Sequence, residues 1–259
     1  MAATILLIGC KDKDPGPTLA PSASSLSAST PAPTTNTILK LVIDPKSKAT
    51  IDMPAPKEHI KAYTDAAAGS FDVDVMNLAN SRGEVKMDLS TITMNHFESA
   101  KDNESQTTHA RCWLEVADCE DQKLPDDVKA ANKYAVYAIR SVDNLSATDL
   151  GKVATTKDAD DDVRDVKMTG HGEVLIHGHK VDRDADLDVA FHYAPGAAAD
   201  KPKLVVVKSV KPFRITLAEH DVKPRDNVGK IAKASFHLLG TKVADTADIS
   251  LEIRAMPQP

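Results

Sequence analysis

The residues of this sequence best suited to hold a metal ion or haem are histidines, several of which fall close to one predicted hairpin. The chain has nine histidines, and those near the hairpin are His171, His177, His179 and His192. A strand would place His177 and His179 on one face, as two ligands of one ion require. However, the chain has no Cys-x-x-Cys, His-Glu-x-x-His or Cys-x-x-Cys-His motif, and an isolated His-x-His pair is common on protein surfaces. We therefore expect no metal and no cofactor, with a histidine-based metal or haem site as an alternative.

Nucleophilic catalysis requires a serine or cysteine paired with a base and an orienting carboxylate. The sequence has no Gly-x-Ser-x-Gly motif and no evident pairing of Ser or Cys with His, so we expect no enzyme activity and name no catalytic residue. The acidic run in residues 155–163 (TTKDADDDV) lacks the central glycine and terminal glutamate of an EF-hand loop. We expect it to be a solvated loop rather than a calcium site.

The cysteines divide into Cys10 near the N-terminus and the pair Cys112 and Cys119. If Cys10 carries lipid, an even number remains, as is usual in an oxidising compartment. Two residues seven apart on one continuous helix would be separated by about 10.5 Å along its axis, which exceeds the Cα distance of about 7 Å that a disulfide can bridge. A disulfide between Cys112 and Cys119 therefore requires a bend within residues 113–118, and the alternative is two free buried thiols.

Residues 1–10 are a short apolar run that ends in Leu-Ile-Gly-Cys. This ending resembles the lipobox at which bacterial prolipoproteins are cleaved and diacylated on the cysteine. A secretory signal begins with a basic segment, and no Lys or Arg precedes Cys10, so we expect this lipoprotein signal to be truncated at its start. A short buried strand is the alternative. Lipid on Cys10 would hold the protein to a membrane, in the periplasm or at the outer-membrane surface.

Residues 11–37 are rich in Pro, Ser, Thr and Ala and contain too few apolar groups to offset the entropy of ordering. We expect a disordered tether that lets a folded domain stand away from the bilayer. The remaining residues 38–259 suit a single all-β domain. The formal charge of −6 argues against nucleic acid as a partner, because there is no excess of Lys and Arg to displace counterions from phosphates.

An alternation of apolar and polar residues dominates the chain after residue 38. In residues 181–193 the apolar side chains alternate with four aspartates, which a helix would scatter and a strand places on one wet face. Residues 71–75 and 85–89 alternate in the same way. Further strands are expected at residues 38–43, 48–53, 134–142, 164–169, 172–178, 203–209, 212–218, 230–238 and 247–254. Strands at this spacing are typical of a sandwich or a barrel.

Two segments depart from this alternation. Residues 57–68 are expected to form a short helix before Gly69. Residues 104–117 carry Ala110, Trp113 and Leu114 at helical spacing and are expected to form a helical lid or plug. Residues 194–202 (APGAAADKP) are expected to be a loop.

Several segments resemble motifs of the YceI-like, lipocalin-shaped protein family. Residues 170–178 (GHGEVLIHG) are similar to that family's Gly-Asp-Leu-Thr-Ile-x-Gly hairpin, and a long alternating strand follows in both. Residues 42–51 resemble its opening Ile-Asp-Pro-x-x-Ser strand pair, with one residue fewer between Pro and Ser. Residues 69–71 and 83–93 resemble its Gly-x-Phe and Val-x-Val-x-x-Ser-Ile-x-Thr strands, and residues 243–253 its closing strand. The resemblance spans residues 40–254.

This resemblance implies an all-β fold, an extended lipocalin-like antiparallel β-barrel of about eight strands with one or two short helices near its mouth. It also implies that the lumen holds a polyisoprenoid or similar long-chain lipid. The chain departs from the family where residues 102–116 replace the Arg-Asp-x-His-Leu and Phe-Phe-Asp segment that covers the mouth. It departs again where His179-Lys180 replaces Thr-Lys. The resemblance therefore implies nothing about which side chains of the lid contact the ligand.

An eight-stranded barrel is just wide enough to be filled by its own side chains or to hold one slender ligand. The candidate lumen residues are Phe71, Val73, Val75, Val85, Met87, Leu187, Val189, Phe191 and Tyr193. If these residues simply pack a dry core, the alternative function is that of an envelope scaffold or interaction domain. The prediction is a membrane-anchored, non-catalytic carrier of a long apolar ligand.

Overall fold

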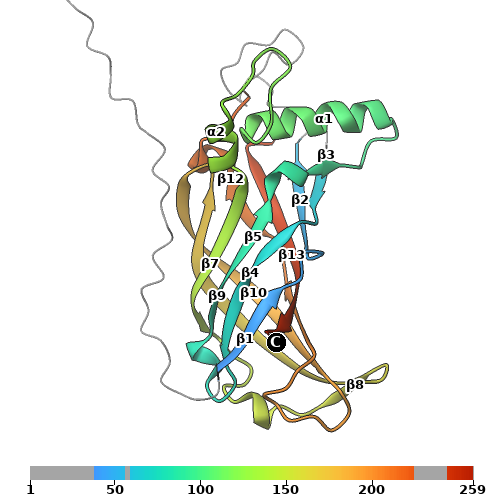
Figure 1. Cartoon of the computed structure of the whole chain (residues 1–259), viewed down its shortest axis with the longest axis vertical. Coiled ribbons are helices and arrows are strands. Elements are labelled where there is room, and N and C mark those ends of the chain that lie inside the picture. The colour runs from blue at the N-terminus through green and yellow to red at the C-terminus, as the bar shows by residue number, and fades with distance from the viewer. Residues whose placement is uncertain (1–37, 56–58, 225–243, 259) are drawn as a thin grey trace, which may run out of the picture.

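The computed structural model describes residues 38–55, 59–224 and 244–258, and its main feature is a closed ring of eight antiparallel strands. The strands of the ring are β1 (Ile38–Ile43), β4 (Ala67–Asp74), β5 (Arg82–Asp88), β7 (Tyr134–Asp143), β9 (Asp161–Ile176), β10 (His179–Tyr193), β11 (Leu204–Ser209) and β13 (Thr246–Pro257). They neighbour one another in this order, and β13 pairs with β1 to close the ring. Figure 1 shows the resulting elongated barrel. The predicted extended barrel of about eight strands is confirmed.

The remaining described elements lie at the two ends of the barrel. The shorter strands are β2 (Lys48–Pro54), β3 (His59–Thr64), β6 (Thr93–Met94), β8 (Thr156–Asp158) and β12 (Phe213–Thr216). The α-helices are α1 (Ala100–Trp113) and α2 (Asp126–Ala131), and the short 3-10 helices are η1 (Leu78–Asn80), η2 (Leu89–Thr91), η3 (Leu150–Lys152) and η4 (Leu217–His220). Figure 1 shows α1 lying across the upper end of the barrel and β8 at the lower end.

The longest hairpin of the barrel joins β9 and β10, which pair over their full lengths from His179–Ile176 to Tyr193–Asp162. The predicted strands 164–169 and 172–178 are thus one continuous strand. Its tight turn is made by His177 and Gly178, whose φ angles of 51° and 76° are both left-handed. Along β10 the side chains alternate between the interior and the surface as predicted. The outward aspartates pair with basic side chains: Asp184 with His171 and Asp188 with Lys167, both on β9, and Asp186 with Lys211 in the connection between β11 and β12.

The last strand, β13, organises the two halves of the barrel. Its C-terminal part pairs with β1 and with β11, and its N-terminal part pairs with β2 on one side and β12 on the other. Strand β2 also pairs with β3, and β3 pairs with β6. The upper half of the barrel therefore has additional walls, and α1 packs against that half through its contact with β6.

Three predicted elements differ from the structure. The helix expected at residues 57–68 is wrong, because residues 59–64 form β3 and β4 begins at Ala67. The loop expected at 155–163 contains a hairpin, with Thr156 opposite Val163. The strand expected at 212–218 ends at Thr216, where η4 follows. The strand expected at 230–238 lies outside the described residues.

One side chain predicted to face water is fully buried. Asp74 has 0% of its surface exposed, although it follows Asp72 in the alternating pattern of β4. Its carboxylate accepts hydrogen bonds from the backbone N–H groups of Met76 and Asn77, both at 3.1 Å, and from Asn80 Nδ2 at 3.0 Å. The aspartate thus closes the turn that leads into η1, since a buried carboxylate requires several donors.

Candidate ligand-binding cavity

The upper half of the barrel encloses a cavity of about 150 Å³ beneath α1. Its walls come from β2, β3, β5, β7, β9, β12 and β13, which contribute mainly Ala, Val, Ile, Leu, Met and Phe. Representative wall residues are Ala49, Ile51, Ile60, Ala62, Val85, Met87, Val174, Ile215, Ile249 and Leu251. The cavity is therefore suited to an apolar ligand, because buried apolar surface binds without needing matched polar partners.

Helix α1 forms the roof of the cavity with one face. Its lining residues recur at the i, i+3, i+4, i+7, i+8 spacing of a single helical face, as Gln106, His109, Ala110, Trp113 and the following Leu114. The side chain of Ser99 starts the helix by accepting a hydrogen bond from Asp102 N at 3.3 Å. This placement agrees with the lid predicted from the spacing of Ala110, Trp113 and Leu114.

Side-chain hydrogen bonds hold the roof to the barrel rim. Arg111 Nε donates to the carbonyl of Ile92 at 3.0 Å, and Thr107 Oγ1 accepts from Met94 N at 3.0 Å. Asn103 makes two further bonds, to the backbone N–H and the carbonyl of Phe97. Since Ile92 and Met94 also line the cavity, these bonds connect the roof to the wall that it covers.

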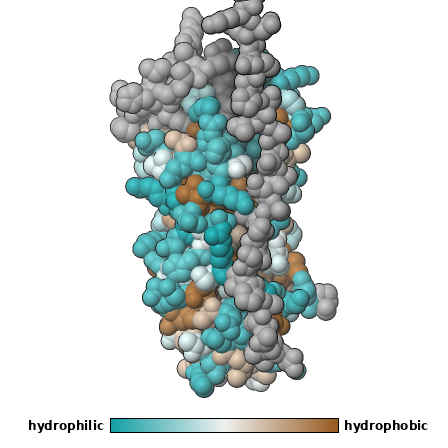
Figure 2. All heavy atoms as spheres, turned by 90° about the vertical axis from the view of Figure 1, so that its left-hand side faces the viewer, coloured by the Kyte–Doolittle hydropathy of each residue, from teal (hydrophilic) through white to brown (hydrophobic). Residues whose placement is uncertain are grey.

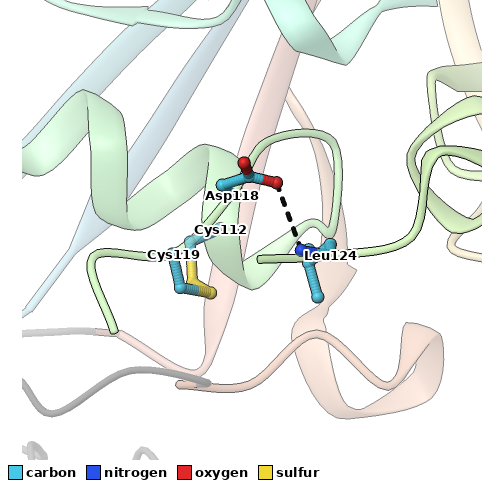
Figure 3. Close-up of a disulfide and its surroundings, with 4 residues drawn as sticks. All are labelled: Cys112, Asp118, Cys119 and Leu124. Atoms are coloured by element: carbon cyan, nitrogen blue, oxygen red, sulfur yellow. Dashed lines mark hydrogen bonds between the residues drawn. A yellow bond between two sulfur atoms is a disulfide. The ribbon is translucent and has the colours of Figure 1, made fainter. Parts of the chain in front are cut away.

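A disulfide between Cys112 and Cys119 closes the loop that follows α1. The bend that this pairing requires is present, because α1 ends at Trp113 and Glu115 adopts a left-handed φ of 54°. The Cα atoms of the two cysteines are 4.9 Å apart, and Figure 3 shows the bridge beside the hydrogen bond from Leu124 N to Asp118 Oδ1. The disulfide thus fastens the loop to the C-terminal end of the roof helix.

Few polar side chains reach the cavity. Thr64 Oγ1 bonds to the carbonyl of Asp88 at 2.9 Å, and Tyr137 Oη donates to the carbonyl of Gly170 at 2.9 Å. His220 is 1% exposed, its Nδ1 lies 3.1 Å from the carbonyl oxygen of His179, and its Nε2 has no hydrogen-bond partner among the described residues. Burial lowers the pKa of His220 below its ordinary value, because the protonated ring loses hydration. His220 is therefore a neutral polar group at the wall of an apolar cavity.

A second, smaller cavity of about 50 Å³ lies among side chains of the lower half of the barrel. The residues predicted for the lumen are divided between the two cavities. Val85 and Met87 line the larger one, whereas Phe71, Val73, Leu187, Val189 and Phe191 line the smaller one. Val75 and Tyr193 are buried but line neither. The lower cavity lies between strands whose inward side chains fill most of the space.

Most of the wall of the larger cavity was not among the predicted lumen residues. These other wall residues come mainly from β2, β3, β6, β7, β9, β12 and β13, from η2 and η4, and from the roof helix. The alternating pattern of the strands does not show which half of the barrel is hollow. Cys10, predicted to carry lipid, lies outside the described residues.

A comparison with solved structures finds proteins that are similar to this chain. A polyisoprenoid-binding domain from Saccharophagus degradans, implicated in plant cell wall breakdown, is 12% identical and superimposes with a TM-score of 0.50, covering 85% of this chain and 99% of that one. BcnA from Burkholderia cenocepacia is 11% identical with a TM-score of 0.50, covering 83% of this chain and 99% of that one. A YCEI protein from Campylobacter jejuni is 13% identical with a TM-score of 0.39, covering 76% of this chain and 85% of that one.

At the level of sequence, the chain matches no model of a known protein family and no curated protein. At identities of 12% and 11%, the likeness to solved structures concerns the fold alone. The closed ring of eight antiparallel strands described above is the architecture that a YceI-like chain is expected to have. We conclude that this chain shares its fold with the polyisoprenoid-binding domain of Saccharophagus degradans and with BcnA.

Proposed function

We propose that this protein is a non-catalytic carrier that binds a polyisoprenoid or similar long apolar chain in the cavity beneath α1. The observation that carries this proposal is the composition of the cavity wall, which is apolar except for a few side chains such as Thr64, Tyr137 and His220. One solved protein with the same fold is described as a polyisoprenoid-binding domain. A prenyl chain consists almost entirely of the kind of surface that such a wall accommodates.

The energetics of burial favour a long chain over a small polar molecule. Each CH₂-sized unit removed from water contributes about 0.8 kcal/mol, so each part of a prenyl chain that the protein covers would add affinity without a single hydrogen bond. A polar ligand would instead lose its hydration and find few partners. We therefore expect affinity to increase with the length of the prenyl chain until the cavity is full.

The size of the cavity determines how much of such a ligand is enclosed. A cavity of about 150 Å³ is comparable to one that accommodates a single benzene-sized group. We infer that the tail of the ligand occupies this space and that the rest of the chain leaves past α1. The polar side chains on the roof, Gln106 and His109, are suited to meet the more polar end of the ligand.

We further propose that lipid on Cys10 anchors the protein to a bacterial membrane, in the periplasm or at the outer-membrane surface, with residues 11–37 as a tether. Support for this comes from the Leu-Ile-Gly-Cys ending of residues 7–10 and from the composition of the following tract. The Cys112–Cys119 disulfide suits an exported protein. Among the described residues, no helix has the length and apolar character needed to cross a bilayer.

Native mass spectrometry of the full chain purified from its own host, followed by lipid extraction, tests the carrier function. Ala110 faces the cavity from α1, so Ala110→Phe fills the space without altering the barrel wall. Glu104 is exposed on the same helix and does not line the cavity, so Glu104→Phe is the matched control. We expect a stoichiometric prenyl species on the wild type and on Glu104→Phe, and its loss from Ala110→Phe.

A different outcome would support the scaffold alternative. If the wild type carries no lipid and takes up no added long-chain polyprenol, the residual cavity is only a packing defect of a filled barrel. If Ala110→Phe and Glu104→Phe retain lipid equally, the ligand lies elsewhere on the molecule.

A further inference from the structure

We propose that His177, His179 and Asp221 form a binding site for a divalent transition-metal ion at the capped end of the barrel. Their ligand atoms all lie within 4.8 Å of one another. His177 lies in the turn between β9 and β10, and His179 is the first residue of β10, whereas Asp221 follows η4. The His-x-His spacing in the sequence indicates that the two histidines could share one ion. It does not indicate the aspartate, which the fold brings to them from a distant segment.

The donor set defines the class of metal. Two imidazole nitrogens and one carboxylate oxygen are a common protein ligand set for Zn²⁺ and for other divalent first-row ions, with water completing the coordination. Ca²⁺ and Mg²⁺ favour sites made of oxygen ligands only. Ligands about 2.05 Å from a tetrahedral ion are about 3.3 Å from one another, so small side-chain rotations would bring these three groups into place. His179 is exposed and can make such a rotation.

The position of Glu115 gives independent support to this assignment. Its Oε2 lies 2.6 Å from His177 Nε2, and Asn132 Nδ2 donates to the same oxygen at 3.2 Å. A metal-bound histidine usually donates its second ring N–H to a carboxylate, which fixes the ring and strengthens it as a ligand. The side chain of His177 is only 8% exposed. Glu115 thus holds the ring so that His177 would bind the ion through Nδ1.

Three separate segments meet at this site. Glu115 lies in the disulfide-closed loop after α1, His177 in the β9–β10 turn and Asp221 at the end of η4. All three have left-handed φ angles, 54°, 51° and 49° respectively, so each side chain projects from a tight turn. The carbonyl of His179 bonds to the buried ring of His220 at 3.1 Å, which ties the hairpin to η4. A bound ion would therefore connect the loop after α1, through Glu115 and His177, to the β9–β10 hairpin and to the end of η4.

Asp221 has a competing cation in the structure. Lys223 Nζ donates to Asp221 Oδ1 at 2.6 Å, and both side chains are nearly half exposed. A divalent ion would have to replace this lysine. The substitution Lys223→Gln removes the competitor and should strengthen metal binding, a result that a purely structural role for the cluster would not produce.

His171 provides a matched control on the same hairpin. Its Nε2 lies 2.8 Å from Asp143 Oδ1 and its Nδ1 lies 2.8 Å from Asp184 Oδ1. The two carboxylates are therefore on opposite sides of the ring, and they cannot share one ion with it. His171 offers the same residue types as the proposed site without their convergence.

The test is calorimetric titration of the metal-free, untagged full chain with ZnCl₂ and with CuCl₂, combined with electron paramagnetic resonance of the Cu²⁺ form. We expect one equivalent to bind with a Kd below about 10 μM and to show coordinated imidazole nitrogens. His179→Ala should weaken binding at least about 100-fold, and Glu115→Gln should weaken it about 10- to 100-fold. Lys223→Gln should strengthen it, and His171→Ala should leave it unchanged.

Three results would overturn the proposal. They are the absence of binding at about 1 mM metal, equal affinities for the wild type and His179→Ala, and loss of the bound equivalent in His171→Ala. Because His179 is exposed, the His179→Ala variant should fold, and its circular dichroism spectrum and thermal unfolding without metal should match those of the wild type.

Discussion

At the scale of single residues, Tyr137 separates the two hollow regions of the barrel. Its side chain lines the larger cavity and its ring is stacked on Phe213, with ring centroids 5.9 Å apart. Its hydroxyl donates to the carbonyl of Gly170. A Cβ atom built on Gly170 would lie 3.6 Å from that hydroxyl and 3.3 Å from Leu187 Cδ1, which belongs to the smaller cavity. Tyr137 thus forms part of the floor that limits the depth of the ligand site.

Removing this floor should lengthen the site. We expect Tyr137→Ala to destabilise the protein by about 3–5 kcal/mol through the space left behind, and to shift binding toward longer prenyl chains. Tyr137→Phe keeps the ring and should lose only about 1 kcal/mol with the hydrogen bond, leaving chain-length preference unchanged. Denaturant unfolding and competition between prenols of different length measure both effects. An unchanged length preference in Tyr137→Ala would show that the ligand does not reach Tyr137.

A second prediction at this scale concerns His171. Hydrogen bonds that the ring donates to Asp143 and to Asp184 raise the pKa of His171 above its ordinary value, because both carboxylates favour the protonated ring. The stabilisation is therefore complete below the unfolded-state pKa of about 6.5 and is lost as the pH rises through the folded-state pKa. Since about a third of the side chain is exposed, the effect should be small.

His171→Gln should accordingly lower the urea midpoint at pH 5.5 and have little effect at pH 9. Unfolding curves of the wild type and the variant across this range provide the measurement. A loss of stability that is the same at both pH values would mean that the contribution of His171 is not electrostatic.

At the scale of elements, the strands with strict alternation were the most predictable. From Ala185 to Tyr193, strand β10 follows the pattern of buried odd-numbered and outward even-numbered residues expected from the sequence. In contrast, the sequence analysis predicts a helix for residues 59–64, but these residues form β3. Every second side chain of this strand is buried, namely Ile60, Ala62 and Thr64. A six-residue strand contains too few alternations to outweigh the adjacent alanine-rich segment, so its pairing with β2 decides the outcome.

The sequence predicts that the lid is a helix, but it does not predict which residues of the barrel the helix contacts. Helical spacing in residues 104–117 indicated a helix, and α1 occupies Ala100–Trp113. Its contacts with the barrel rim depend on pairings that are distant in sequence, such as Arg111 with the carbonyl of Ile92. For the same reason, the approach of Asp221 to His177 and His179 could not be inferred from residue spacing.

The Cys112–Cys119 disulfide should control how readily the roof opens. Closing a loop of this length stabilises the folded state by about 2–3 kcal/mol in the chain-entropy view. We expect the double variant Cys112→Ala/Cys119→Ala to lose about that amount and to release bound prenol at least about 10-fold faster than the wild type. Hydrogen exchange of residues 105–119 and the dissociation rate of a fluorescent prenol measure these changes.

The control for this prediction is Cys10→Ser, which leaves the bridge intact. Equal dissociation rates in the double variant and the wild type would show that the roof remains closed without the bridge, held by hydrogen bonds such as that from Arg111.

At the scale of the whole molecule, the exterior and the interior differ in chemistry. Figure 2 shows mainly hydrophilic side chains on one face of the barrel, with scattered apolar patches. Large exposed apolar side chains among the described residues are few. Among them, Val42 and Met256 lie opposite each other on β1 and β13, whereas Met76 and Val210 lie in connections between elements. This surface suits a barrel that stands in water, with its apolar groups directed toward the lumen.

The proposed anchor therefore has to be supplied from outside the barrel. We expect Cys10→Ser to move the protein from the membrane fraction to the soluble fraction of its host, while prenol affinity and thermal stability stay unchanged. Fractionation with detergent extraction, together with mass spectrometry of the N-terminal peptide, provides the measurement. Retention of Cys10→Ser in the membrane fraction would indicate a different means of attachment.

The seam between β1 and β13 has a consequence for the order in which the protein folds. Only three residue pairs, from Leu41–Pro257 to Ile43–Ala255, join these strands, and they connect the first and last described strands of the chain. The ring cannot close until the C-terminal strand is available, and contacts of such high contact order form slowly because a long loop must be closed first. Until then, β1 is an open strand edge that can pair with another chain. We therefore expect newly synthesised molecules to pass through an aggregation-prone open sheet, which makes the timing of seam closure a property on which selection can act.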